Sequence, residues 1–118
     1  MSLLTDIGNQ LSGETVYYSE IPSKAIDNVC CLYRVISRAP DLDLDGISLR
    51  NPSIRILVRD STYFDAESRM EAIINIVTTF QNSNILSIFL ESDIIDLGRD
   101  DEHQLYRIYC IFRLKVIV

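Results

Sequence analysis

The residues whose type and spacing could bind a metal lie in one acidic stretch. Carboxylates at alternate positions can converge on a hard cation, and a glycine permits the turn between them. The first half of a calcium-binding loop has this pattern, and it is matched by Asp41, Asp43, Asp45 and Gly46. The second half of the calcium-binding pattern is absent, because Pro52 occupies the position that should supply a bidentate glutamate. We therefore interpret the stretch as an acidic solvated or interface loop and expect no metal.

Groups for nucleophilic or acid–base catalysis are few. The only histidine, His103, lies in a polar turn beside acidic residues, where a solvated side chain is the simpler interpretation. Cys30 and Cys31 are adjacent, so their side chains would leave a strand on opposite faces, and neither has metal or redox spacing. We expect the cysteines to be buried, reduced thiols, because free cysteine behaves as a small hydrophobe.

A phosphate site is also poorly supported. The four glycines are scattered at positions 8, 13, 46 and 98, so no glycine-rich phosphate loop exists. One candidate anion site remains, the Leu-Gly-Arg-Asp segment at 97–100, and it has neighbouring carboxylates that would repel an anion: Asp96, Asp100, Asp101 and Glu102. We expect no enzyme and no cofactor. A small phosphate-binding enzyme is the less favoured alternative.

Composition limits the class of protein. A chain of 118 residues fits one domain, 1–118, and a chain of this size buries roughly 65% of its unfolded surface. The apolar fraction of 47% and charged fraction of 24% predict a compact soluble fold. A net charge of -6 argues against a phosphate-neutralising nucleic-acid surface, although DNA could pass nearby. Neither a signal peptide nor a run of ~18 apolar residues is present, so we expect a cytoplasmic site of synthesis and no membrane.

Hydrophobic periodicity predicts the elements of the first half. Apolar residues at helical spacing from Leu3 to Leu11 predict a short amphipathic helix. A short strand is expected near Tyr17, and the run Asn28 to Ile36 is apolar on both faces, as in a central strand. Residues 39–52 are rich in Asp, Gly and Pro and predict a loop.

A strand and a long helix follow. Ser53 to Asp60 alternates with period two, which predicts a half-buried strand. Thr62 with Asp65 three residues later resembles a capping box. The helix that it opens has one apolar stripe, which comprises Ala66, Met70, Ile73, Ile74, Val77 and Phe80.

The last third predicts two strands. Ile85 to Glu91 is an apolar strand, and Asp96 to Gln104 is a polar connection. The final strand has one apolar face, which comprises Tyr106, Ile108, Cys110, Phe112, Leu114 and Val116. The resulting α-β-β-α-β-β order predicts an α+β fold, in which a mainly antiparallel sheet packs on one long helix, with a short N-terminal helix added. Ile56, Ile74 and Phe112 should pack helix against sheet.

Five segments of the chain form a recognisable series. They are Ile21-Pro22, Ala39-Pro40-Asp41-Leu42, Asn51-Pro52 with the strand Ser53 to Arg59, Tyr63-Phe64-Asp65-Ala66, and Leu97-Gly98-Arg99-Asp100. In this order and at similar spacing, the segments resemble those of the minor capsid proteins of tailed bacteriophages, which are grouped with tail terminators and tail completion proteins. The resemblance spans residues 21–116. An Asp101-Glu102-His103 turn stands where that family usually has a glycine-rich turn.

The resemblance implies a single tail-terminator-like domain with a structural role in the virion. Such a protein is assembled in the host cytoplasm into a homo-oligomeric, usually hexameric, ring at the neck. The ring terminates the tail tube and joins the tail to the head connector or stopper protein. DNA passes through the channel without sequence-specific binding. A head-completion ring protein of the connector, a stopper or an adaptor, is the alternative.

The strand face opposite the core is the candidate subunit interface. Its mixed Arg, Tyr and aliphatic character suits protein contacts better than bulk solvent, although an ordinary solvated face is the alternative. The residues expected there are Arg34, Arg55, Leu57, Arg59, Arg107, Tyr109, Ile111, Arg113 and Lys115. In a cyclic ring each subunit presents one surface to a different surface of its neighbour. The basic residues Arg55, Arg59, Arg107 and Arg113 could therefore meet the acidic Asp41, Asp43 and Asp45 of the next copy.

Overall fold

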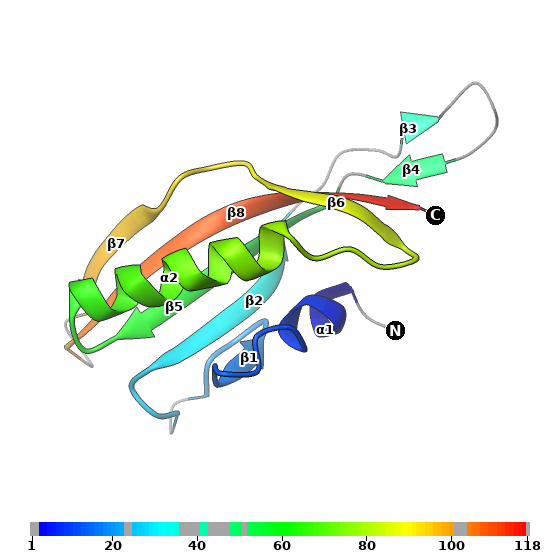
Figure 1. Cartoon of the computed structure of the whole chain (residues 1–118). Coiled ribbons are helices and arrows are strands. Elements are labelled where there is room, and N and C mark those ends of the chain that lie inside the picture. The colour runs from blue at the N-terminus through cyan, green and yellow to red at the C-terminus, as the bar shows by residue number, and fades with distance from the viewer. Residues whose placement is uncertain are drawn as a thin grey trace.

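In the part of the chain that the structure describes, one large sheet and two helices make up the fold (Figure 1). The computed structural model describes residues 3–22, 25–35, 41–42, 48–50, 52–100 and 104–117. The helices are α1 (Leu3–Gly8) and α2 (Tyr63–Thr78). The strands are β1 (Val16–Tyr18), β2 (Val29–Val35), β3 (Asp41–Leu42), β4 (Ser48–Arg50), β5 (Ser53–Asp60), β6 (Ile85–Leu90), β7 (Ile95–Asp100) and β8 (Leu105–Ile117).

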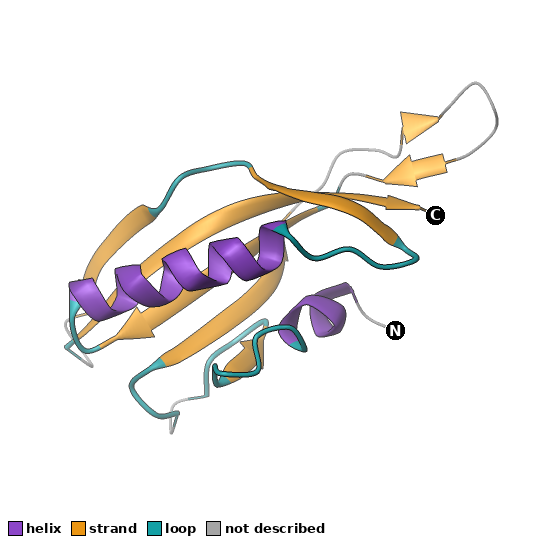
Figure 2. Ribbon diagram, in the orientation of Figure 1, coloured by secondary structure: helices purple, strands orange, loops and turns teal. Residues whose placement is uncertain are grey.

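The longest strand, β8, organises the sheet. One edge of β8 pairs with β5 and β4, and its other edge pairs with β6 and β7. β2 joins the far edge of β5, and β1 joins β2 in parallel, whereas all other pairs are antiparallel. The α+β fold with a mainly antiparallel sheet is therefore confirmed, but the sheet formed by the described residues has eight strands and is larger than the sequence predicted. Figure 2 shows the long helix lying across one face of this sheet.

Two segments predicted as connections form strands instead. β7 lies in the predicted polar connection and pairs with the start of β8. Its alternation is hidden because the register shifts between Asp96 and Gly98, where Gly98 has a φ of 78°. The Asp96 carboxylate accepts a hydrogen bond of 2.7 Å from the Gly98 N–H and stabilises this bulge. The second correction is the predicted loop 39–52, which contains the short strands β3 and β4.

The helix α2 begins where the sequence predicted. Thr62 is its N-cap, and the Thr62 hydroxyl accepts a hydrogen bond of 3.2 Å from the Asp65 N–H. The predicted stripe faces the sheet, with its central residues fully buried and Ile74 and Phe80 at the margin of the core. Ile56 and Phe112 are fully buried in the same core, so the predicted strand face is the inner one.

Both helices cover the same face of the sheet. The N-terminal helix buries Leu4 and Ile7 in the core that also contains Leu32 of β2 and Ile54 of β5. No described helix covers the opposite face, which we call the helix-free face. Arg34 was predicted to lie there, but this prediction is wrong: Arg34 pairs with Ile54, so its side chain is on the helix-covered side.

Candidate functional site

Strand register gathers basic and aromatic side chains on the helix-free face. Tyr33, Arg55 and Ile111 form one cross-strand row over β2, β5 and β8, and Arg113 and Phe89 are paired in another row. Residues paired across neighbouring strands point to the same side, so these side chains are neighbours. We call this set the basic sheet face, and it comprises Tyr33, Arg55, Phe89, Arg107, Tyr109, Ile111 and Arg113.

Arg55 lies at the centre of the basic sheet face. Its guanidinium carbon is 4.2 Å from the centroid of the Tyr109 ring and 5.5 Å from that of Tyr33. Such cation–π contacts hold a guanidinium by the negative faces of the rings without neutralising its charge. Arg55 Nε is buried and has no hydrogen-bond partner, and no carboxylate of the described residues forms an ion pair with Arg55. The positive charge of Arg55 is therefore not neutralised by the described residues.

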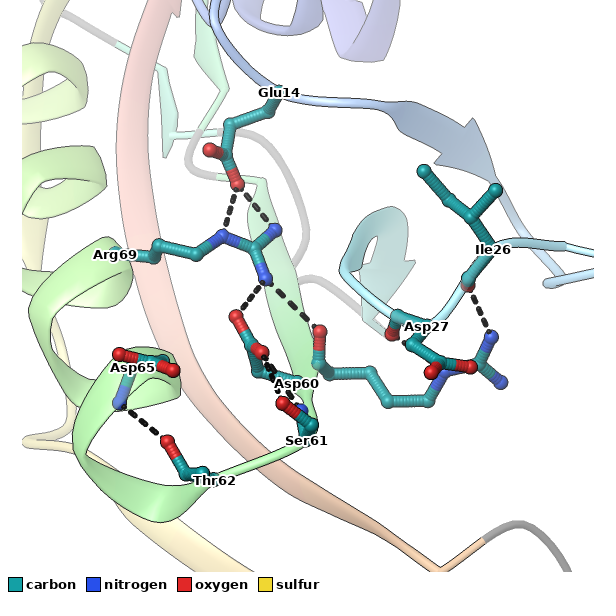
Figure 3. Close-up of polar contacts among 9 residues, drawn as sticks. Glu14, Ile26, Asp27, Asp60, Ser61, Thr62, Asp65 and Arg69 are labelled. Carbon is teal, nitrogen blue, oxygen red and sulfur yellow. Dashed lines mark hydrogen bonds and ion pairs between the residues drawn. The ribbon is translucent and has the colours of Figure 1, made fainter.

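Arg59, the second predicted interface residue, has a role within the fold. Its side chain is only 8% exposed. Arg59 Nη2 donates to the Ile26 carbonyl at 2.9 Å, and Arg59 Nε donates to the Asp27 carbonyl at 3.3 Å. Figure 3 shows Ile26 and Asp27, the two residues whose carbonyls accept these bonds. Because both bonds hold the segment before β2, Arg59 is less available to a partner than Arg55.

Arg113 and Arg107 complete the predicted basic set. Arg113 forms an ion pair with Glu91, which also accepts a hydrogen bond of 3.1 Å from the Ser53 hydroxyl. Arg107 lies directly opposite Arg59 in the register. The Nε atoms of Arg107 and Arg113 are buried without hydrogen-bond partners. Arg113 is therefore already paired with a carboxylate of the same chain, whereas Arg107 forms no ion pair with any described residue.

Beside Arg107 the helix-free face has a hollow of about 280 Å³. Two guanidinium groups line it, and so do the carboxylates of Glu20 and Asp100. Opposite charges in equal number give no excess of positive potential for a small anion. The hollow therefore does not have the electrostatics of a phosphate site.

The acidic half of the predicted interface is only partly described. Asp41 lies in β3, opposite Leu49 of β4. Asp43, Asp45 and His103 lie outside the described residues. Within the described ranges, no three His, Cys, Asp or Glu residues group in a way that could hold a metal ion.

All three cysteines are free and buried, as the sequence predicted. Burial raises the pKa of Cys30 from 9.0 to about 12, and the negative charge of Glu14 adds to this effect. Burial likewise raises the pKa of Cys31 and of Cys110 to about 11. A thiol with so high a pKa has almost no nucleophilic thiolate at neutral pH.

We expect slow alkylation of all three thiols in the folded chain at pH 8. The folded-state pKa values lie above the unfolded value of 9.0, so the thiols bind protons more tightly in the fold. Their contribution to stability is complete below pH 9 and is lost as the pH rises from 9 to about 11 for Cys31 and Cys110 and to about 12 for Cys30. Iodoacetamide labelling followed by mass spectrometry measures the rate, with denatured protein as the fully reactive control. Fast labelling of the folded chain would show that these strand positions are open.

A cluster of charges that the sequence did not reveal joins three segments (Figure 3). Arg69 of α2 binds Glu14 through Nε at 2.9 Å and through Nη2. Arg69 Nη1 donates to the Asp60 carboxylate and to the Arg59 carbonyl, each at 2.9 Å. Burial lowers the pKa of Arg69, but hydrogen bonds and charges from Glu14 and Asp60 outweigh it, so the pKa is raised overall. The partners are 9 and 55 residues away in sequence, so no local pattern could identify them.

Neither helix in the described part of the chain is long and apolar enough to cross a membrane.

Comparison with known proteins identifies a shared fold. No protein family and no curated protein sequence matches the chain. Among solved structures, the chain is similar to a chain of the virion of a native gene transfer agent (GTA) particle. The TM-score is 0.64 at 14% identity, and the match covers 99% of this chain and 96% of that chain. The chain therefore has the fold of a subunit of that virion.

Proposed function

We propose that this chain is a structural, non-enzymatic protein of a phage-like virion. The observation that carries the proposal is the fold shared with a virion subunit over nearly the full length of both chains. Full coverage matters because a shared fragment inside a larger protein would not suggest the same role. Fold alone does not determine function. The predicted family resemblance, which rests on sequence segments rather than on the fold, supports the same class.

Within the virion we propose a place at the neck. The chain forms a homo-oligomeric ring, hexameric by the family resemblance, which terminates the tail tube and joins the tail to the head connector or stopper protein. The basic sheet face supports the ring, because the charges of Arg55 and Arg107, which form no ion pair with any described residue, and the exposed Phe89 suit an interface. A stopper or adaptor ring in the connector is the second candidate, since it needs the same kind of lateral contact.

Deletion of the gene tests this function. A virus that lacks the chain should still make DNA-filled heads, but should accumulate unattached or overlong tails, because the joining ring is missing. Negative-stain electron microscopy of the lysate scores these parts. Filled heads that leak DNA beside tails of normal length would favour the stopper or adaptor. Normal infectious particles would contradict both roles.

A further inference from the structure

The structure leaves two complementary surfaces on opposite sides of the sheet. We propose that the outer face of α2 in one copy docks on the basic sheet face of the next copy. The inference deepens the proposed ring and rests on it for its biological role, but the contact itself can be tested on the purified chain.

The basic sheet face carries charge that the described carboxylates do not neutralise, because Arg55 and Arg107 form no ion pair with any described residue. In the described part of the structure, the buried side-chain nitrogen and oxygen atoms without hydrogen-bond partners are the Nε atoms of Arg55, Arg107 and Arg113, all on this face. These covered Nε atoms are out of a partner's reach, so it is the unneutralised charge of Arg55 and Arg107 that favours a partner with carboxylates. Phe89, 46% exposed, adds apolar area beside Arg113. The partner should therefore carry carboxylates together with apolar side chains.

The outer face of α2 has this composition. Phe64 is 79% exposed, the largest exposure among the exposed large hydrophobic residues, and Ile76 is also exposed on the same helix. The helix carries three acidic side chains, Asp65, Glu67 and Glu71. Its one basic residue, Arg69, is directed inward, where Glu14 and Asp60 bind it. The solvent side of α2 is therefore acidic and apolar, in a chain of net charge -6.

The position of the two surfaces selects the type of contact. They lie on opposite faces of one sheet, so contact between them is front to back and can repeat from copy to copy. Such heterologous contacts close into rings when the rotation between copies permits it. Contact between two basic sheet faces would instead place Arg55 near Arg55, and like charges oppose that arrangement. Charge complementarity thus favours a second copy in the head-to-tail orientation.

Charge reversal in the purified full-length chain tests the contact by sedimentation velocity. Arg55→Glu should weaken self-association at least about tenfold, because it replaces the central cation by an anion. Arg34→Glu is the matched control, since Arg34 is an exposed arginine that belongs to neither the basic sheet face nor the outer face of α2, and it should leave association unchanged. Adding Glu71→Arg to Arg55→Glu should restore part of the association. Circular dichroism and melting temperature show whether each variant is folded.

Mixing two blocked variants tests the head-to-tail orientation. Phe64→Asp blocks the α2 surface and Arg55→Glu blocks the basic sheet face, so each variant alone should be monomeric. Their mixture retains one intact contact and should form a one-to-one dimer that does not grow further. A contact between identical faces could not be restored by mixing.

Other outcomes overturn the docking. Wild-type protein that remains monomeric up to its solubility limit, or Arg55→Glu that associates normally, excludes this contact. Rescue by reversal of Asp41, Asp43 and Asp45, but not of Glu71, would assign the acidic loop as the partner instead. If Arg55→Glu abolishes binding to DNA and leaves self-association unchanged, the basic sheet face binds nucleic acid and not a second copy. Purified virions that contain the chain would still support the proposed function in each of these cases, whereas virions without it would refute that function.

Discussion

Phe112→Ala should lower the free energy of unfolding by about 3–5 kcal/mol, the range for removing a fully buried phenylalanine. Phe112 is fully buried at the centre of β8, where Ile54 of β5 and Leu90 of β6 lie on either side of it. Alanine leaves a cavity that the sheet and α2 cannot close. Urea unfolding followed by circular dichroism measures the change, which is a large part of the 5–15 kcal/mol total of a small domain.

Phe64→Ala is the matched control for this prediction. It removes the same atoms from a side chain that is 79% exposed, so the loss should be within about 0.5 kcal/mol. An unchanged melting temperature for Phe112→Ala would mean that the opposite face of β8 is the inner one. Equal losses in the two variants would contradict the arrangement of α2 on the sheet.

Arg69→Met should cost about 3 kcal/mol, at the lower end of the range for breaking a buried ion pair. The side chains of Arg69, Glu14 and Asp60 are 18%, 19% and 10% exposed, so little solvent reaches them. Without the arginine, the two carboxylates repel each other and lose their donors. The loss should loosen the connection between α2, the end of β5 and the segment before β1. Urea unfolding at neutral pH measures the change in the free energy of unfolding.

Neutral carboxylate variants separate charge from packing in this cluster. Adding Glu14→Gln and Asp60→Asn to Arg69→Met should recover part of the stability, because no unpaired charge remains. Arg99→Met is the control, since Arg99 is exposed and 6.0 Å from the centroid of the Tyr106 ring, and its loss should be within about 0.5 kcal/mol. A similar cost for Arg69→Met and Arg99→Met would show that the cluster adds little to the fold.

The sequence alone determined the elements whose signal is local. The capped helix after Thr62, the strand Ser53–Asp60 and the inner face of the last strand were all predicted from periods of 3.6 or 2 in nearby residues, although Ser53–Asp60 is buried on both faces and not half-buried as predicted. Edge strands give a weaker signal. β7 escaped prediction because the bulge at Gly98 breaks the alternation and both of its faces are partly exposed.

Only the tertiary structure decided which charged residues work together. Six basic residues were predicted on one face, but the fold uses Arg59 to hold the segment before β2 and turns Arg34 to the helix-covered side. It leaves Arg55 between two tyrosines from neighbouring strands. In the sequence, nothing distinguished Arg69 from the other polar residues of its helix. Its role became visible only in the fold, where Glu14 and Asp60 form ion pairs with it. The physical reason is range: periodicity reports burial within one element, whereas a charged side chain acquires its role from partners that strand register and helix packing bring from distant parts of the chain.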